Sequence, residues 1–278
     1  MRAMIKTLAG TAITVAAMSA AHADSQLFNW NLNLPSGQTI TGINQLGFNG
    51  ESFIQNQGFG NGDSFTFTDN GIFNITTKNA GTTLFGGNGQ LTGDFQGGTG
   101  TGSVSGRSIM FNEGGVLNIY FNTAQTYDSA GATVANRDGA ATGTLIASFR
   151  QTAGGGGAIN ADGTPNSNGQ LTLNFVSTYF APGVFTDSNG NSLMAGSTIG
   201  FVTANASQDL GNASSATARE TLTGSANTIN NPPAYFYVNN GGQLKLNMSA
   251  ANAVPEPASL AIFGAGLMGL AFLRRRKS

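Results

Sequence analysis

The sequence predicts an all-β protein whose main body is an antiparallel β-sandwich or jelly-roll-like domain. Two patterns lead to this fold class. Short segments of alternating apolar and polar residues recur between Gly, Asn and Asp clusters, and no segment of the body has a sustained, capped helical period. The composition agrees, because 41 of the 278 residues are glycine while 19 phenylalanines supply material for a core.

The first segment, residues 1–23, has the pattern of a secretory signal peptide. Arg2 and Lys6 form a basic start, a mostly apolar stretch follows, and Ala21-His22-Ala23 has the small-x-small pattern that signal peptidase recognises. We therefore expect signal peptidase to cleave between Ala23 and Asp24, so that residue 24 begins the exported protein.

Residues 24–248 form the predicted β-rich extracellular domain. The clearest pattern is a hairpin with strands at 64–68 and 72–76, because Asp69-Asn70-Gly71 between them favours a positive-φ turn. Residues 239–242, Asn-Asn-Gly-Gly, predict a second hairpin between strands 235–238 and 243–248. The glycine run 154–157 is interpreted as a flexible loop tip.

Further strands are expected where the alternation continues. The alternation predicts one buried face. The expected strands are 116–121, 144–149, 171–180 and 198–203, with less regular candidates at 27–34, 39–46 and 52–54, and the buried face contains Phe65, Phe67, Leu171, Leu173 and Phe175.

Three short segments follow the body. Residues 249–257 are a predicted linker that ends in Val254-Pro255-Glu256-Pro257, and the two prolines keep it extended and accessible. Residues 258–273 are apolar, and 16 residues of helix cover roughly 24 Å, somewhat less than the ~30 Å hydrocarbon core of a bilayer. Residues 274–278 begin with Arg274, Arg275 and Arg276, a basic cluster typical of a cytoplasmic tail. We therefore predict a single transmembrane helix over 258–273.

These last segments resemble the sorting tail of the PEP-CTERM family of bacterial exported proteins. The resemblance rests on Pro255-Glu256-Pro257, the glycine-interrupted apolar segment and Arg274, Arg275 and Arg276. It implies cleavage at the tail by exosortase, a membrane-embedded cysteine peptidase. It also implies an inner-membrane intermediate and a final location at the cell surface or in the extracellular matrix of a Gram-negative bacterium.

A second resemblance concerns the body. Residues 46–56, followed by residues 63–73, are similar to the N-terminal part of flocculation-associated PEP-CTERM proteins. This resemblance implies a role in floc formation together with exopolysaccharide.

The composition of the body excludes several kinds of chemistry. The chain has no cysteine, and its one histidine, His22, lies in the predicted signal peptide, so that Ser–His and thiolate nucleophiles are excluded and zinc loses its preferred ligands. Residues 24–254 contain six basic and twelve acidic residues, which argues against a nucleic-acid partner. No cofactor is predicted. For a glycosidase, Glu51 and Glu113 are the best acid candidates, because each flanks an expected strand.

Two candidate ligand sites remain. Asp187, Asn189 and Asn191 have the spacing of calcium-loop oxygens. However, Ser192 stands where an EF-hand needs glycine, and no acid is found near Thr198, so a hairpin tip is the preferred interpretation.

Aromatic side chains at a surface stack on sugar rings. The candidates are Trp30, Tyr179, Tyr235 and Tyr237, of which Tyr235 and Tyr237 are preferred, because alternation places both on the face opposite Phe236.

The sequence therefore favours a non-enzymatic surface or exopolysaccharide-matrix protein that promotes cell aggregation, flocculation or biofilm formation. Its expected partners are signal peptidase, exosortase, the membrane before processing and exopolysaccharide. The alternatives are a carbohydrate-binding module acting alone and a glycosidase that remodels the matrix.

Overall fold

The structure, a computed structural model, describes residues 25–79, 81–87, 89–127, 137–161, 166, 171–196, 198–208 and 235–248. The predicted signal peptide, linker, transmembrane helix and basic tail lie outside these residues. Within them the chain is all-β and every strand pairing is antiparallel, which confirms the predicted class.

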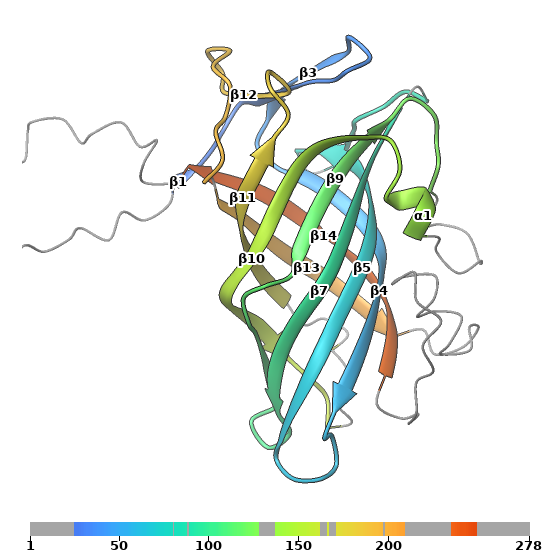
Figure 1. Cartoon of the computed structure of the whole chain (residues 1–278), viewed down its shortest axis with the longest axis vertical. Coiled ribbons are helices and arrows are strands. Elements are labelled where there is room, and N and C mark those ends of the chain that lie inside the picture. Colours follow the sequence, from blue (N-terminus) through green and yellow to red (C-terminus); the bar gives the residue numbers. More distant parts are fainter. Residues whose placement is uncertain are drawn as a thin grey trace, which may run out of the picture.

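The described strands form two sheets (Figure 1). The 11-stranded sheet contains β1 (Ser25–Gln26), β4 (Leu46–Gln57), β5 (Ser64–Lys78), β6 (Thr82–Thr83), β7 (Gln90–Ser103), β8 (Ser108–Phe111), β9 (Val116–Asn122), β10 (Thr144–Ala158), β11 (Leu171–Phe180), β13 (Thr198–Gln208) and β14 (Tyr235–Met248). The three-stranded sheet contains β2 (Trp30–Asn33), β3 (Thr39–Ile43) and β12 (Phe185–Thr186). One short helix, α1 (Arg137–Ala140), packs against β5 and β7.

The large sheet closes on itself. Strand β4 pairs with β5, and the pairing continues through β7, β9, β10, β11, β13 and β14 back to β4. In Figure 1, β5, β7, β9 and β10 form a front wall, and β13 and β14 cross behind it. The short strand β8 lies between β7 and β10 at the lower end of this wall. Two walls thus enclose one core.

Pairs of phenylalanine and glycine fill much of that core. Phe65 lies opposite Gly102 and Phe67 opposite Gly100 on the paired strands β5 and β7. A Cβ atom on either glycine would overlap the ring of its partner. Since paired residues point to the same face of a sheet, the glycine provides the space that the ring occupies. This pairing gives a structural reason for the abundance of both residue types.

Both predicted hairpins are wrong, because each predicted turn lies inside one long strand. Asp69, Asn70 and Gly71 belong to β5, which pairs without interruption with residues 52–54 of β4 on one side. On its other side β5 pairs with β7, and a β-bulge in this pairing accommodates the three residues. There the Gly97 N–H donates a hydrogen bond to Asn70 Oδ1 over 2.9 Å. Residues 239–242 likewise continue β14, which pairs with both β4 and β13 there.

The glycine run 154–157 is also part of a strand, β10, and the predicted loop tip is wrong. Gly155 has φ 88° and lies against Thr172 of β11, where a Cβ would overlap the Thr172 carbonyl oxygen. Only glycine combines this φ with such a close approach, so that the run permits an irregular strand rather than a loop.

Strands with regular alternation were predicted well. Strand β11 spans the predicted residues 171–180, and β9 differs from its prediction by one residue. All five residues predicted for the buried face, Phe65, Phe67, Leu171, Leu173 and Phe175, are buried.

The two ends of the described chain meet at one rim of the closed sheet, which we call the Ser25–Met248 edge. Strand β1 pairs with the last strand, β14, so that Ser25 and Met248 are neighbours. Figure 1 shows this pair at the side of the molecule, away from the loop that joins β4 to β5 at the lower end. Segments that precede residue 25 and follow residue 248 are therefore attached at adjacent points.

Candidate functional site

The acidic residues of the described body do not form an open carboxylate pair. Glu51 on β4 and Asp94 on β7 both lie opposite Ile72 of the intervening strand β5, and they are 4% and 2% exposed. Glu113, the other acid candidate, is exposed in the loop before β9. A glycosidase needs two carboxyl groups that face the same open cleft, whereas Glu51 is buried and Glu113 is exposed on a separate loop.

A third buried acid, Asp69, points into the core from β5, where it lies between Ile54 and Gly98. Burial raises the pKa of this carboxyl to about 7, although a hydrogen bond from Ser52 acts in the opposite direction. Its Oδ1 atom has no hydrogen-bond partner in the described structure. Asp69 therefore has a larger effect on stability than on surface chemistry.

The aromatic candidates differ in their exposure. Trp30 is fully buried and stacks on Phe185 at a centroid distance of 5.8 Å, so this candidate is a core residue and does not stack on a sugar. Tyr179 on β11 is 40% exposed. Tyr235 and Tyr237 pair with Gln55 and Phe53 across β14 and β4, and Phe53 is buried. The side chains of the two tyrosines are outside the described part of the structure.

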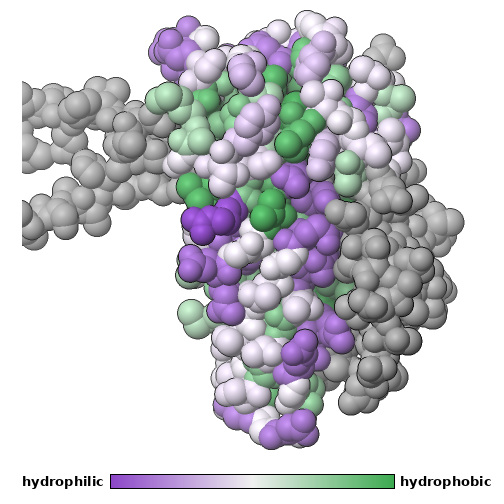
Figure 2. Space-filling model, viewed as in Figure 1, coloured by the Kyte–Doolittle hydropathy of each residue, from purple (hydrophilic) through white to green (hydrophobic). Residues whose placement is uncertain are grey.

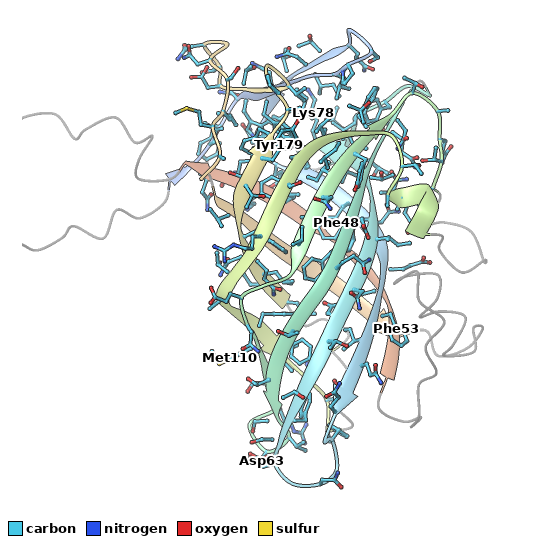
Figure 3. All side chains as sticks on the ribbon, viewed as in Figure 1. Phe48, Phe53, Asp63, Lys78, Met110 and Tyr179 are labelled. Atoms are coloured by element: carbon cyan, nitrogen blue, oxygen red, sulfur yellow. The ribbon has the colours of Figure 1, made fainter. Side chains whose placement is uncertain are left out.

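Tyr179 belongs to a mixed apolar and polar surface on β9, β10 and β11, which we call the Tyr179 face. Its cross-strand neighbour Ser148 donates a hydrogen bond from Oγ to Asn118 Oδ1 over 2.6 Å. Leu145 and Val116 on the same face are 36% and 40% exposed. Figure 2 shows apolar patches among polar atoms on the upper half of the front wall, and Figure 3 places Tyr179 there.

This combination suits a weak carbohydrate contact. A tyrosine ring covers the apolar face of a sugar, while hydroxyl and amide groups beside it exchange hydrogen bonds with sugar hydroxyls. The sequence had indicated Tyr179 as one aromatic candidate. It did not indicate Ser148 and Asn118, because their proximity depends on the register of three strands.

The calcium candidate forms a hairpin tip. Asp187 Oδ1 accepts hydrogen bonds from the N–H groups of Asn189 and Asn191, both over 2.8 Å, and Asp187 Oδ2 accepts one from Asn191 Nδ2 over 2.9 Å. These hydrogen bonds, the side-chain bond from Asn191 above all, lower the pKa of the Asp187 carboxyl. The turn itself thus uses the carboxylate, as the preferred interpretation expects. Calcium binding stays a weak prediction at Asp187, Asn189 and Asn191.

The sorting signals lie outside the described residues. These are the cleavage residues Ala21, Ala23 and Asp24, the motif Val254-Pro255-Glu256-Pro257 and the basic residues Arg274, Arg275 and Arg276. Within the described part of the chain, no helix is long and apolar enough to cross a membrane.

Comparison with known proteins bears on these signals. Residues 253–277 match the model of the PEP-CTERM protein-sorting motif. No curated protein and no solved structure matches the chain. The chain therefore carries a PEP-CTERM protein-sorting motif, which implies an exported protein that exosortase sorts through a membrane-anchored intermediate before it reaches the surface or the extracellular space.

Proposed function

We propose that this chain is a non-enzymatic surface or matrix protein that associates with exopolysaccharide and promotes cell aggregation, flocculation or biofilm formation. The sorting motif at residues 253–277 carries the proposal, because it sends the protein to the place where matrix polysaccharide is found. The exported part is a sandwich-like body whose two walls face each other across one core, and the producing cell is Gram-negative.

The surface chemistry of the body supports a binding role over catalysis. Residues 24–254 contain neither histidine nor cysteine, and Glu51 and Asp94 are buried. The outer face of the front wall carries mostly hydrophilic or intermediate residues with scattered hydrophobic ones, as Figure 2 shows. Its polar residues include Ser148, Asn118 and Thr66. Such a surface has the groups that exchange hydrogen bonds with a polysaccharide and lacks the nucleophiles of most hydrolases.

The position of the chain ends supports attachment to a surface during sorting. Ser25 and Met248 pair at one edge, and the matched motif begins a few residues after Met248. A body held there is tethered at a single point, and the Tyr179 face on the front wall is left accessible. Both signal peptidase and exosortase then act on neighbouring parts of the molecule.

A deletion strain tests the proposal. We expect it to sediment more slowly than the parent, and expression of the full chain to restore sedimentation. A Pro255→Ala/Glu256→Ala/Pro257→Ala variant should not restore it, whereas an Asn252→Ala/Ser259→Ala control, with substitutions on either side of Pro255-Glu256-Pro257, should. Unchanged sedimentation after deletion would contradict the proposal.

Mass spectrometry of the protein from cells and from matrix tests the processing directly. We expect an N-terminus at Asp24 and loss of residues 274–278 from the surface form. An intact basic tail on that form would contradict handling by exosortase.

A carbohydrate-binding module acting alone is the second candidate, and the exposed Tyr179 beside Ser148 and Asn118 favours it. Pull-down of the processed protein on purified exopolysaccharide tests it. Tyr179→Ala should weaken the binding if the polysaccharide contacts the Tyr179 face. Tyr235→Ala/Tyr237→Ala should weaken it if the polysaccharide contacts β14. Release of reducing sugar would instead support the glycosidase alternative.

A further inference from the structure

A groove crosses the lower end of the front wall, on the outer face of the large sheet. Its volume is about 460 Å³, and its lining residues come from β4, β5, β7 and β8. This volume lies within the range of small-molecule sites in proteins, roughly 300–1,000 Å³. None of the strands that form it belongs to the Tyr179 face, which lies on β9, β10 and β11.

Two rows of side chains form the walls of this groove, and each row follows the cross-strand register. The first row is Ser64, Ser103 and Ser108, and the second is Thr66, Thr101 and Met110. Gln57 of β4 pairs with Thr66 and extends the second row. Because residues i and i+2 of a strand lie about 7 Å apart, the rows are separated by about the width of one sugar chain.

The floor between the rows is backbone. Phe65, Gly102 and Ile109 alternate with the row residues, and the buried side chains of Phe65 and Ile109 point into the core. Phe65 lies against Gly102 on that inner side. The Phe–Gly packing inside the sheet therefore leaves a flat floor outside, with no side chain to obstruct a ligand.

Every residue that lines the groove is uncharged. Close by, Asp63 and Arg107 carry one charge of each sign. Asp63 is held in place, because its Oδ2 accepts a hydrogen bond from Ser103 Oγ over 3.0 Å and its Oδ1 accepts one from the Ser105 N–H over 2.6 Å. This arrangement favours a neutral ligand, since it offers no cluster of cations to an acidic polymer.

The two rows also include one apolar side chain. Met110 at the end of the second row is 60% exposed, and Figure 3 shows it at the outer edge of the wall. A thioether is polarisable and adapts its shape to an apolar surface such as the C–H face of a sugar. The hydroxyls of the two rows both donate and accept hydrogen bonds, as sugar hydroxyls do.

We propose that this groove binds a segment of a neutral polysaccharide, which lies across β5, β7 and β8 between the two rows. The inference rests on the proposed association with exopolysaccharide and assigns it a ligand class and a site. The groove is about 40 Å along β5 from the Lys78 end. Because β14 and β4 place the Ser25–Met248 edge near that end, the groove stays open while the tail holds the protein at the membrane.

The test compares two pairs of threonines on the same two strands. Thr66 pairs with Thr101 in the groove, and Thr68 pairs with Thr99 one row away, outside the lining. Affinity electrophoresis of the processed protein in gels that contain dextran, soluble hydroxyethyl cellulose or alginate measures binding to two neutral polymers and one anionic polymer.

We expect retardation by at least one neutral polymer and not by alginate. Thr66→Val/Thr101→Val should weaken the binding at least tenfold, because two hydroxyl contacts are lost without a change of shape. Thr68→Val/Thr99→Val should bind like the parent, and both variants should keep its melting temperature. Equal binding by the two variants, binding to alginate alone, or no retardation by any polymer would overturn the proposal.

The same variants separate this inference from the proposed function. If Thr66→Val/Thr101→Val loses polymer binding but still restores sedimentation to the deletion strain, the matrix role stands and the groove is not its basis. If deletion leaves sedimentation unchanged while the Thr66/Thr101 pair still controls polymer binding, the groove site stands and the aggregation role is lost.

Discussion

The inner and outer faces of β5 and β7 are built from opposite kinds of residues, although the same backbone carries both. On the inner face a phenylalanine of β5 lies opposite a glycine of β7, which has no side chain, as in the pairs Phe65–Gly102 and Phe67–Gly100. On the outer face the pairs Thr66–Thr101 and Thr68–Thr99 are equal in size and polar. The inner pairs fix the spacing of the wall, whereas the outer pairs leave its surface free for contacts.

This difference predicts that substitutions on the two faces separate stability from binding. An inner substitution meets a close-packed interior, which tolerates neither added volume nor cavities. An outer substitution meets solvent, where most changes have small effects on stability. The predictions below test that separation, beginning with the inner face.

Gly100→Val should have the largest effect. Its Cβ would overlap both the Phe67 ring and the Met110 carbonyl oxygen, and a backbone atom has little freedom to move away. We expect a loss of about 4 kcal/mol or more in the free energy of unfolding, a large part of the roughly 5–15 kcal/mol by which a typical domain is stable. Urea denaturation followed by circular dichroism measures it. A stable Gly100→Val variant would show that the wall does not depend on this pair.

The pH dependence of stability should depend on Asp69. Its pKa is raised from the ordinary 3.8 to about 7, so that between these values the folded state holds more protons than the unfolded state. Stability should therefore fall as the pH rises from about 4 to 7 and stay level above it, by at most about 4 kcal/mol.

Asp69→Asn should remove this dependence and stabilise the protein at pH 8. Asp187→Asn is the matched control, because hydrogen bonds within its turn lower the pKa of the Asp187 carboxyl and the side chain is at the surface. Denaturation midpoints at pH 4, 6 and 8 provide the measurement. An equal pH dependence in the parent and in Asp69→Asn would contradict the assignment.

The same strand, β5, shows how far sequence reasoning reaches. Alternation correctly placed Phe65 and Phe67 on the buried face, because a period of two depends on one strand alone. Asp69-Asn70-Gly71 was interpreted as a turn. A glycine that permits a turn and a glycine that lies opposite a large residue within a sheet cannot be told apart in the sequence. Gly71 lies opposite Phe95, and only the pairing partner distinguishes the two cases.

The candidate sites were limited by the same missing information. Tyr179 and Trp30 were both aromatic candidates, yet Tyr179 is exposed and Trp30 is buried, because exposure depends on how the strands pair. The groove was not found, because Ser64, Ser103 and Ser108 come together only through the register of β5, β7 and β8. The sorting motif, in contrast, is read as a linear segment, and comparison confirmed it at residues 253–277.

Gly102→Ala should have an intermediate effect that a second substitution relieves. The three atoms nearest to the added Cβ all belong to the Phe65 ring, whereas at Gly100 a carbonyl oxygen is among the nearest. We expect a loss of about 2 kcal/mol for Gly102→Ala, in the range for overpacked cores. Phe65→Leu should recover part of it, which a double-mutant cycle of urea unfolding measures. Strictly additive effects would show that the two residues do not share this space.

Substitutions on the outer face should have the smallest effect on stability. Valine has the shape and strand preference of threonine, so that Thr66→Val/Thr101→Val and Thr68→Val/Thr99→Val should each change the free energy of unfolding by no more than about 0.5 kcal/mol. The measurement is urea denaturation of both variants beside the parent. A loss comparable to that of Gly102→Ala in either variant would mean that the outer hydroxyls also hold the wall together. Small and equal changes would instead show that the two faces of β5 and β7 vary independently, so that any difference in polymer binding between these variants comes from the groove.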